Sequence, residues 1–249
     1  MAKQIPIKLL KHIDSLVAHF VDNKNTFRVL EVGLNTMIGE SIGLRDLMHS
    51  YKSRIKDPSH LKDKLLRKAN ELKKGETFDY TLDDLFEKIN DLVGFRILHL
   101  HTSQFEAINI ELKKILAEHK WQIIEGPNAR TWDDETRAYF TSIGVETSPH
   151  PNMYTSVHYI LKSNNSNPIT CEIQVRTLME EVWGEVDHKI NYPHKSNSHS
   201  CREQIKTLAR VTSSCSRLVD SIFSTYNYEH KKQDDIKVQP IKKITRKKD

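Results

Sequence analysis

The stretch NMYTSVHY, residues 152–159, decides the fold together with CEIQVRT, residues 171–177. Polar and apolar residues alternate in both stretches with the period of two that is typical of a β-strand. The Asn-, Ser- and Pro-rich run at residues 163–168 predicts a hairpin loop between them. The sequence therefore predicts an antiparallel pair of strands.

Each of these strands would turn a polar face to the same side of the sheet. The face comprises Tyr154, Ser156 and His158 from the first strand and Glu172, Gln174 and Arg176 from the second. Because Glu and Gln are disfavoured in strands, the cluster needs an explanation. It indicates either a functional surface or the solvated outer face of an antiparallel sheet, and spacing alone does not separate the two.

The composition is that of a globular protein. The 249 residues are 37% hydrophobic and 29% charged, which suits one large domain with helical appendages. The formal charge of +5 suits a phosphate-rich ligand, and it equally suits ordinary solubility.

The three cysteines, Cys171, Cys201 and Cys215, form no Cys-x-x-Cys pair, which argues against a disulfide framework and against a structural zinc site. Alternation in the second strand predicts that Cys171 faces the core. No apolar run approaches the length of a membrane span, and the N-terminus lacks a signal-peptide core. We expect a cytoplasmic protein that does not associate with a membrane.

The rest of the chain predicts helices and strands in alternation. Helices are expected at residues 5–21, at 26–51 with breaks at Gly33, Gly39 and Gly43, from Pro58 to near Gly75, and at 82–90, 105–119, 178–190 and 202–223; further strands are expected at 91–98, 121–124 and 136–145, and a loop at 146–152. Asp57 and Thr177 are the expected N-caps of two of these helices. The order predicts an α+β fold, in which helices flank a mixed sheet and helical segments lie at both ends of the chain.

Two charged features need partners. Arg96 interrupts the apolar strand 91–98, and a buried arginine requires an anion, which Asp91 or a bound phosphate could supply. In the helix after Thr177, we expect Leu178, Val182, Val186 and Ile190 to point inward. Glu181, Glu185 and His188 would then share another face, as metal ligands or as a hydrated flank.

Five blocks occur in a fixed order along the chain. They are Arg54-x-Lys56 with Lys64 downstream, Asp91-x-x-Gly94-x-Arg96, Tyr154-x-Ser156-x-His158, EIQVRT at residues 172–177, and EVWGEVDHK at residues 181–189. This ordered set resembles the synthetase domain of the RelA/SpoT family, the alarmone synthetases, over about residues 51–193. We accordingly divide the chain into a helical N-terminal segment (1–50), a synthetase-like domain (51–195), a C-terminal helix (196–228) and a flexible basic tail (229–249).

The resemblance implies a nucleotidyltransferase-like fold and a defined reaction. Members transfer the β,γ-pyrophosphate of ATP to the 3′-hydroxyl of GDP or GTP, which releases AMP and makes (p)ppGpp. It implies that Asp91 and Glu172 are catalytic and hold Mg²⁺, and that Glu172 helps the metal or accepts the hydroxyl proton. The implied ATP ligands are Arg54, Lys56, Lys64 and Arg96, and the implied acceptor ligands are Tyr154, Ser156, His158, Gln174 and Arg176.

The chain departs from the family pattern around the acceptor site. Met153 stands where the family usually has glycine, and the loop before it carries no lysine. An adenine nucleotide or the 3′ end of tRNA is therefore an alternative acceptor, and a non-catalytic nucleotide or RNA binder is a third reading. No His-Asp dipeptide occurs, so no hydrolase activity of the family's long members is expected. The sequence leaves open a homo-oligomer and an antitoxin partner.

Overall fold

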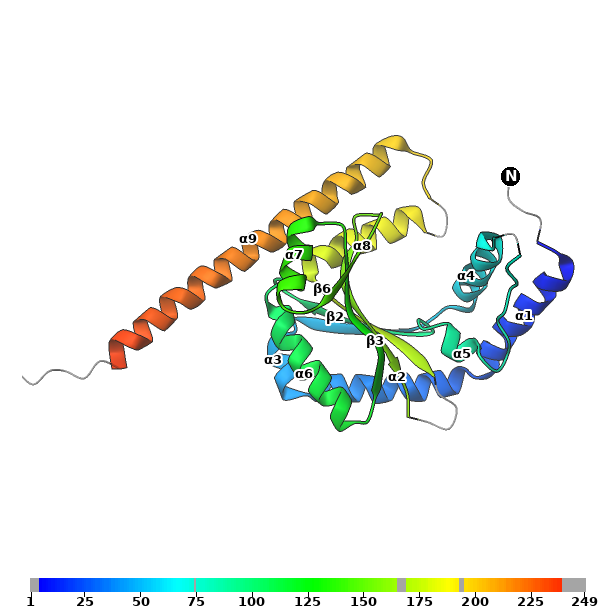
Figure 1. Ribbon diagram of the computed structural model, residues 1–249, viewed down its shortest axis with the longest axis horizontal. Helices are drawn as coiled ribbons and strands as arrows, with labels where there is room; N and C mark the ends of the chain where they lie inside the picture. Colours follow the sequence, from blue (N-terminus) through cyan, green and yellow to red (C-terminus); the bar gives the residue numbers. More distant parts are fainter. Residues whose placement is uncertain (1–4, 74, 165–168, 193–194, 239–249) are drawn as a thin grey trace, which may run out of the picture.

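The computed structural model describes residues 5–73, 75–164, 169–192 and 195–238, without the side chains of 231–238. It contains a six-stranded mixed sheet in the order β1-β2-β6-β5-β3-β4 (Figure 1). The strands are β1 (Ser50–Ile55), β2 (Val93–His99), β3 (Gln122–Thr131), β4 (Glu146–Pro149), β5 (Thr155–Lys162) and β6 (Thr170–Thr177). The helices are α1 (Ile7–Asp22), α2 (Lys24–Gly39), α3 (Ile42–Leu47), α4 (Pro58–Glu71), α5 (Leu85–Lys88), α6 (Gln104–Glu118), α7 (Asp134–Ser142), α8 (Leu178–Asn191) and α9 (His199–Val238). The α+β fold with helices flanking a mixed sheet is as predicted.

The centre of the sheet is the predicted hairpin. β5 and β6 pair antiparallel, with His158 opposite Gln174, although residues 165–168 of the connecting loop lie outside the described residues. β6 then pairs parallel with β2, which places Gln174 beside Arg96. β1 completes this side of the sheet antiparallel to β2, with Lys52 opposite Arg96. The polar faces of these strands therefore lie next to each other.

The opposite face of the sheet is the core. Val157, Tyr159, Ile173 and Val175 are at most 1% exposed and pack in one hydrophobic cluster with residues of α1, α2 and α6. The buried hydroxyl of Tyr159 donates to Asn109 Oδ1 at 2.9 Å, which satisfies its only polar atom. Cys171 is 1% exposed on this face, as the alternation predicted. Burial of this face fixes the register, because a shift by one residue would exchange the two faces.

Two predicted helix starts are confirmed. The Asp57 side chain accepts the N–H of Ser59 at the start of α4, where Pro58 occupies the first turn. Thr177 and Glu180 form a reciprocal capping box at the start of α8. The capping box fixes the point where β6 ends and α8 turns back over the polar face.

Two expectations around residues 134–152 are wrong. Of the residues expected as a strand at 136–145, those up to Ser142 belong to α7. The Asp133 side chain accepts the N–H groups of Glu135 and Thr136 and outweighs the strand preference of the aromatic residues that follow. Residues 146–149, expected as loop, form the edge strand β4, which pairs parallel with β3. Such a pairing depends on tertiary contacts that local sequence does not report.

Other boundaries also differ from expectation. α2 continues through Gly33 and ends at Gly39, α3 includes Gly43, and residues 50–51 belong to β1 instead of a helix. On α8 the buried residues are Glu181 and Trp183, whereas Val182 is 50% and Ile190 39% exposed. The expectation that Val182 and Ile190 point inward is therefore wrong, whereas Val186 packs against the cluster of Trp183, Ile205 and Ala209.

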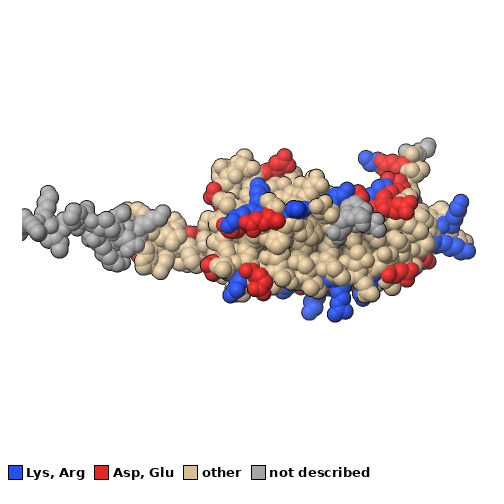
Figure 2. Space-filling model, turned by 90° about the horizontal axis from the view of Figure 1, so that it is seen from below, with Lys and Arg blue, Asp and Glu red and all other residues tan. Residues whose placement is uncertain are grey.

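The last helix is longer than expected and lies partly outside the body of the protein. α9 extends to Val238, into the stretch from residue 229 that was expected as a tail, and residues 239–249 lie outside the described part. Its first half packs on α8, where Ile205 and Ala209 cover Trp183, and its second half projects away from the sheet (Figure 1). The face seen in Figure 2 carries interspersed acidic and basic side chains. Within the described ranges, none of the helices combines the length and apolar character needed to span a bilayer.

We predict that Thr177→Ala lowers the free energy of unfolding by about 1 kcal/mol, the usual cost of losing a side-chain N-cap. Urea unfolding measures the change. Ser216→Ala is the control, because Thr177 Oγ1 also lies 3.2 Å from Ser216 Oγ, so both variants lose that contact and only Thr177→Ala loses the cap. A Thr177→Ala effect no larger than that of Ser216→Ala would contradict the role of the cap.

Candidate active site

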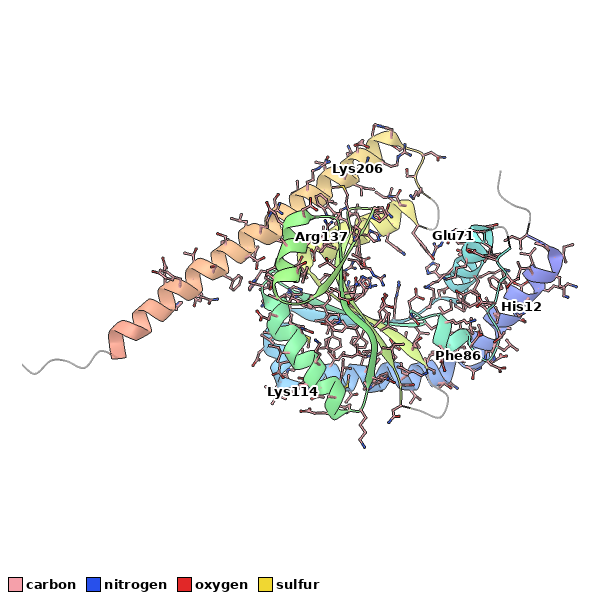
Figure 3. The ribbon with its side chains drawn as sticks, viewed as in Figure 1. His12, Glu71, Phe86, Lys114, Arg137 and Lys206 are labelled. Atoms are coloured by element: carbon pink, nitrogen blue, oxygen red, sulfur yellow. The ribbon has the colours of Figure 1, made fainter. Side chains whose placement is uncertain are left out.

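The polar face of the sheet borders a cleft with two adjoining halves. The first half, about 700 Å³, lies between the sheet, the loop before β5, α8 and the start of α9. The second half, about 420 Å³, lies on the side of β5 and α4. In Figure 3, α9 with the labelled Lys206 and α4 with the labelled Glu71 stand on opposite sides of this face of the sheet. The two halves share a common boundary, formed by Asp91, His150, Tyr154, Glu172 and Gln174.

Asp91 lies in the turn before β2 and is held by two lysines. Its carboxylate oxygens accept hydrogen bonds from Lys56 Nζ at 2.8 Å and from Lys64 Nζ at 2.7 Å. Burial alone would raise the pKa of Asp91, but the charges and hydrogen bonds of Lys64 and Lys56 outweigh it and lower the pKa to about 2. The carboxylate is therefore fully ionised at neutral pH.

Glu172 lies on β6 and is held by its neighbours on the sheet. Its Oε1 lies 2.8 Å from His158 Nδ1, and its Oε2 accepts from Gln174 Nε2 at 2.8 Å. Burial raises the pKa of Glu172, but the hydrogen bonds and charge of its neighbours outweigh this and lower it. Because an ionised carboxylate only accepts, His158 Nδ1 donates to Glu172, and Nε2 lies 3.0 Å from the Tyr154 hydroxyl.

The two carboxylates fit a divalent cation. Asp91 and Glu172 border both halves of the cleft, and their charges act on each other, although the hydrogen bonds of His158 and Gln174 keep the pKa of Glu172 lowered. Mg²⁺ usually takes one or two carboxylates from a protein and its other oxygen ligands from substrate phosphates and water, so this donor set suits Mg²⁺. Within the described residues, no group of three or more His, Cys, Asp and Glu side chains could hold a metal.

Arg96 finds its anion on α8 and not at Asp91, which corrects one of the expected pairings. Arg96 Nη1 donates to Glu181 Oε1 at 2.8 Å and to Glu185 Oε1 at 2.8 Å. Glu181 also accepts from Arg176 Nη2. Glu181 is thus neither a metal ligand nor part of a hydrated flank, because it is 6% exposed and paired with cations.

The structure brings most of the predicted site residues to this cleft. Those that line one or both halves are Arg54, Lys64, Asp91, Arg96, Tyr154, His158, Glu172, Gln174 and Arg176. Lys56 is 8% exposed and reaches the cleft through Asp91. Ser156 is 1% exposed, and its hydroxyl donates to the carbonyl of Val175 at 3.4 Å, so the expected contact of Ser156 with an acceptor is wrong.

Two rings of the cleft were not expected from the sequence, those of His150 and Tyr192. Both line the first half, and the Tyr192 ring stacks on that of His188 with centroids 4.6 Å apart. The sequence signal of His150 and Tyr192 was weak, because rings in a loop and at a helix end follow no alternation. Trp183 and His188, from the block at residues 181–189, also line the first half. Lys52 had a readable signal, because it shares the strand face of Arg54, two residues away.

The glycine that the family usually has before the tyrosine is explained by the backbone. Met153 has a φ of 56°, in the left-handed region that favours glycine. Its side chain compensates in part, since it packs with Tyr154 against the cluster of Trp183, Ile205 and Ala209. The turn that presents Tyr154 to the cleft is therefore formed with a different residue type.

The fold and the site define a class: an α+β protein whose cleft combines two ionised carboxylates with several cationic side chains, as a nucleotide-phosphate site requires. Residues 53–197 match the family model described as "Region found in RelA / SpoT proteins". The match covers more than half of the sequence, so the chain belongs to the RelA/SpoT family.

Individual relatives agree with this assignment. The chain is 26% identical over 196 residues to the GTP pyrophosphokinase YwaC of Bacillus subtilis (strain 168), with 73% of this chain and 80% of that protein covered. The fold is similar to that of small alarmone synthetase 1 of Bacillus subtilis bound to its product pppGpp, with a TM-score of 0.55, 17% identity and coverage of 83% and 95%. It is also similar to that of a GTP pyrophosphokinase family protein from Streptococcus pneumoniae, with a TM-score of 0.57, 16% identity and coverage of 90% and 97%.

The pKa of Asp91 predicts a pH-dependent contribution to stability. The folded-state value of about 2 lies below the ordinary 3.8, so the unfolded chain takes up the proton first as the pH falls. The stabilisation is complete well above pH 3.8 and is lost as the pH falls towards 2. We expect Asp91→Asn to lower the free energy of unfolding at pH 7 by roughly 2 kcal/mol or more, and the gap to the wild type to shrink below pH 4.

Urea unfolding between pH 2.5 and 7 measures this gap. Asp134→Asn is the matched control, because the Asp134 side chain is 89% exposed on α7 and lies outside the cleft. Its curve should follow that of the wild type at every pH. A gap for Asp91→Asn that stays constant down to pH 2.5 would show that the lysines do not stabilise the ionised carboxylate.

Proposed function

We propose that this protein is a GTP pyrophosphokinase that transfers the β,γ-pyrophosphate of ATP to the 3′-hydroxyl of GDP or GTP, makes (p)ppGpp and releases AMP. One observation carries the proposal: Asp91 and Glu172 lie on the boundary shared by the two halves of the cleft. A donor in one half and an acceptor in the other would meet there. Membership of the RelA/SpoT family and the similarity to YwaC support the same reaction. We expect the protein to act in the cytoplasm, where these nucleotides are found.

Cationic side chains suit the donor. Arg54 and Arg96 face the first half of the cleft, and Lys56 and Lys64 converge on Asp91. Phosphoryl-type transfer depends mainly on positioning and on neutralising the charge of the phosphate oxygens. We assign these four residues to the ATP phosphates, with Arg54 also able to stack on the adenine ring.

The acceptor is assigned to the Tyr154 side of the boundary. Tyr154 borders both halves of the cleft, and its hydroxyl end is held by His158, so we assign its ring to stack on the acceptor base. His158 and Gln174 flank Glu172 and are assigned to the acceptor ribose and phosphates. Arg176 is 3% exposed, so its part here is to support the Tyr154 ring, from whose centroid Arg176 Cζ lies 5.9 Å.

The chemical step follows from these positions. The 3′-oxygen of the acceptor forms a bond to the β-phosphorus of ATP, the bond between that phosphorus and the oxygen bridging to the α-phosphate breaks, and AMP leaves with the electron pair. Glu172, ionised and held by His158 and Gln174, accepts the proton of the 3′-hydroxyl. Mg²⁺ held by Asp91 and Glu172 would supply neutralisation of the phosphate charge.

The acceptor assay tests the proposed function. Purified protein is incubated with ATP labelled on the γ-phosphate and with GDP, GTP, ATP or tRNA as separate acceptors. We expect label on GDP or GTP and release of AMP. Label only on tRNA or on an adenine nucleotide would overturn the guanine assignment and favour a toxic relative of the family. Nucleotide binding without AMP release would indicate a non-catalytic binder.

Substitution of the two carboxylates tests their roles. Asp91→Asn and Glu172→Gln should each lower kcat by on the order of 100-fold, because the removal of a positioned base or fixed charge usually costs at least that. Both rates are measured at saturating Mg²⁺ and corrected for the folded fraction. Asp134→Asn should keep the wild-type rate. Full turnover in both cleft variants would contradict the assigned chemistry.

A further inference from the structure

Glu181 has an unusual place beside the cleft. It lies on α8 with its side chain only 8% exposed, and it is absent from the described residues that line either half of the cleft. It nevertheless contacts three cationic residues that do line the first half, Lys52, Arg96 and Arg176. Glu181 can therefore act on a ligand only through these residues.

The contacts of Glu181 divide between its two oxygens. Oε1 accepts from Lys52 Nζ at 3.0 Å and from Arg96 Nη1 at 2.8 Å, while Oε2 accepts from Arg96 Nη1 at 3.0 Å and from Arg176 Nη2. Arg96 and Arg176 belong to the neighbouring parallel strands β2 and β6. The single carboxylate thus ties the ends of two guanidinium groups that project from the same side of the sheet.

The positive charges of Arg96 and Arg176 require a shared anion. Two guanidinium groups side by side at a partly buried surface repel each other, and burial without an anion would be costly. Burial raises the pKa of Glu181, but the attraction of Arg176 and Arg96 and the hydrogen bond of Lys52 outweigh it and lower the pKa to about 2. At neutral pH Glu181 carries its full charge between the two arginines.

The next turn of α8 leaves space for the guanidinium group of Arg176. Gly184 lies three residues after Glu181, and a Cβ added there would lie 2.7 Å from Arg176 Nη1. Glycine inside a helix is unfavourable by about 1 kcal/mol relative to alanine, so its presence here needs a reason. The space that Gly184 leaves is occupied by Arg176.

Arg176 also contacts Tyr154, the residue assigned to the acceptor base. Arg176 Cζ lies 5.9 Å from the centroid of the Tyr154 ring, within the range of a cation–π contact. Arg96, on the other side of Glu181, faces the first half of the cleft. One carboxylate thereby connects a residue assigned to the donor with the residue that supports the acceptor ring.

We propose that Glu181 is a positioning residue, which fixes Arg96 and Arg176 relative to each other and so sets the alignment of the two substrates, with Gly184 providing the space that Arg176 needs. The proposal deepens the proposed function and rests on it for its kinetic test. Glu181 touches neither substrate.

The test must separate positioning from charge and folding. Loss of the Glu181 charge would remove the anion that pairs with the buried Arg176 and leave Arg96 with Glu185 alone. That loss threatens the fold and also changes the attraction for phosphate. Two variants avoid this. Glu181→Asp keeps the charge and moves it by one methylene length, and Gly184→Ala raises helix propensity while it displaces Arg176.

We expect both variants to fold with melting temperatures close to the wild type and to lose about 100-fold in kcat, because a shift of about 1 Å in a positioned group costs that much. Their affinity for the ATP analogue AMPCPP, measured by calorimetry with Mg²⁺, should fall by only about threefold, equivalent to one weakened hydrogen bond. A larger loss in kcat than in affinity is the signature of misalignment.

Glu180→Ala is the matched control for a purely structural effect. Glu180 precedes Glu181 on the same helix, and its carboxylate accepts from the backbone N–H of Thr177. Among the described contacts it forms no hydrogen bond or ion pair with Arg96 or Arg176, although the charge of Arg176 acts on it. Its variant should lower stability and leave kcat per folded molecule unchanged. Wild-type kcat in both Glu181→Asp and Gly184→Ala, or a loss no larger than that of Glu180→Ala, overturns the proposal.

Failure of the proposed function gives a different result. If wild-type protein releases no AMP with any acceptor, the pyrophosphokinase assignment fails and AMPCPP affinity alone decides the positioning role. A reduced affinity in Glu181→Asp and Gly184→Ala, with Glu180→Ala unchanged, then supports it. Equal affinity in all three variants and the wild type overturns it.

Discussion

The structure depends on how charges are balanced on one face of a buried sheet. Strands β1, β2 and β6 bring Lys52, Arg96, Arg176 and Glu172 to the same side. Such groups are stable there only when each finds a counter-charge or hydrogen-bond partner. Glu181 supplies the counter-charge for the arginines. Lys56, which follows β1, and Lys64 of α4 supply it for Asp91. The polar face can therefore pack under α8 without losing its ionised groups.

This balance also prepares the face for chemistry. Asp91 and Glu172 stay ionised because their neighbours hold their pKa values low, and they lie where the two halves of the cleft meet. Preorganised charges of this kind stabilise a transition state without reorganisation during the reaction. A chain of contacts from Tyr154 through His158 to Glu172 orients the ring and the carboxylate together.

Local sequence predicted what depends on neighbouring residues. The alternation in NMYTSVHY and CEIQVRT predicted the hairpin and its polar face, because a strand exposes successive residues on opposite sides. The capping signals at Asp57 and Thr177 were read correctly for the same reason. Local preference also gave one wrong prediction, because the aromatic residues of α7 favour a strand. The segment forms a helix because Asp133 caps it, and Asp133 is itself held by hydrogen bonds from Ser213 and Arg217.

The sequence by itself determined the sheet face, the family and the set of ionisable residues that the cleft uses. Only the tertiary structure decided which of these residues pair. Asp91 lies five residues before Arg96 in the sequence and was, beside a bound phosphate, one of its two expected partners. Arg96 instead pairs with Glu181, which is 85 residues away. The reason is physical: sequence spacing fixes only the face on which a side chain emerges, whereas the packing of α8 over β2 and β6 fixes which opposite charge can reach it.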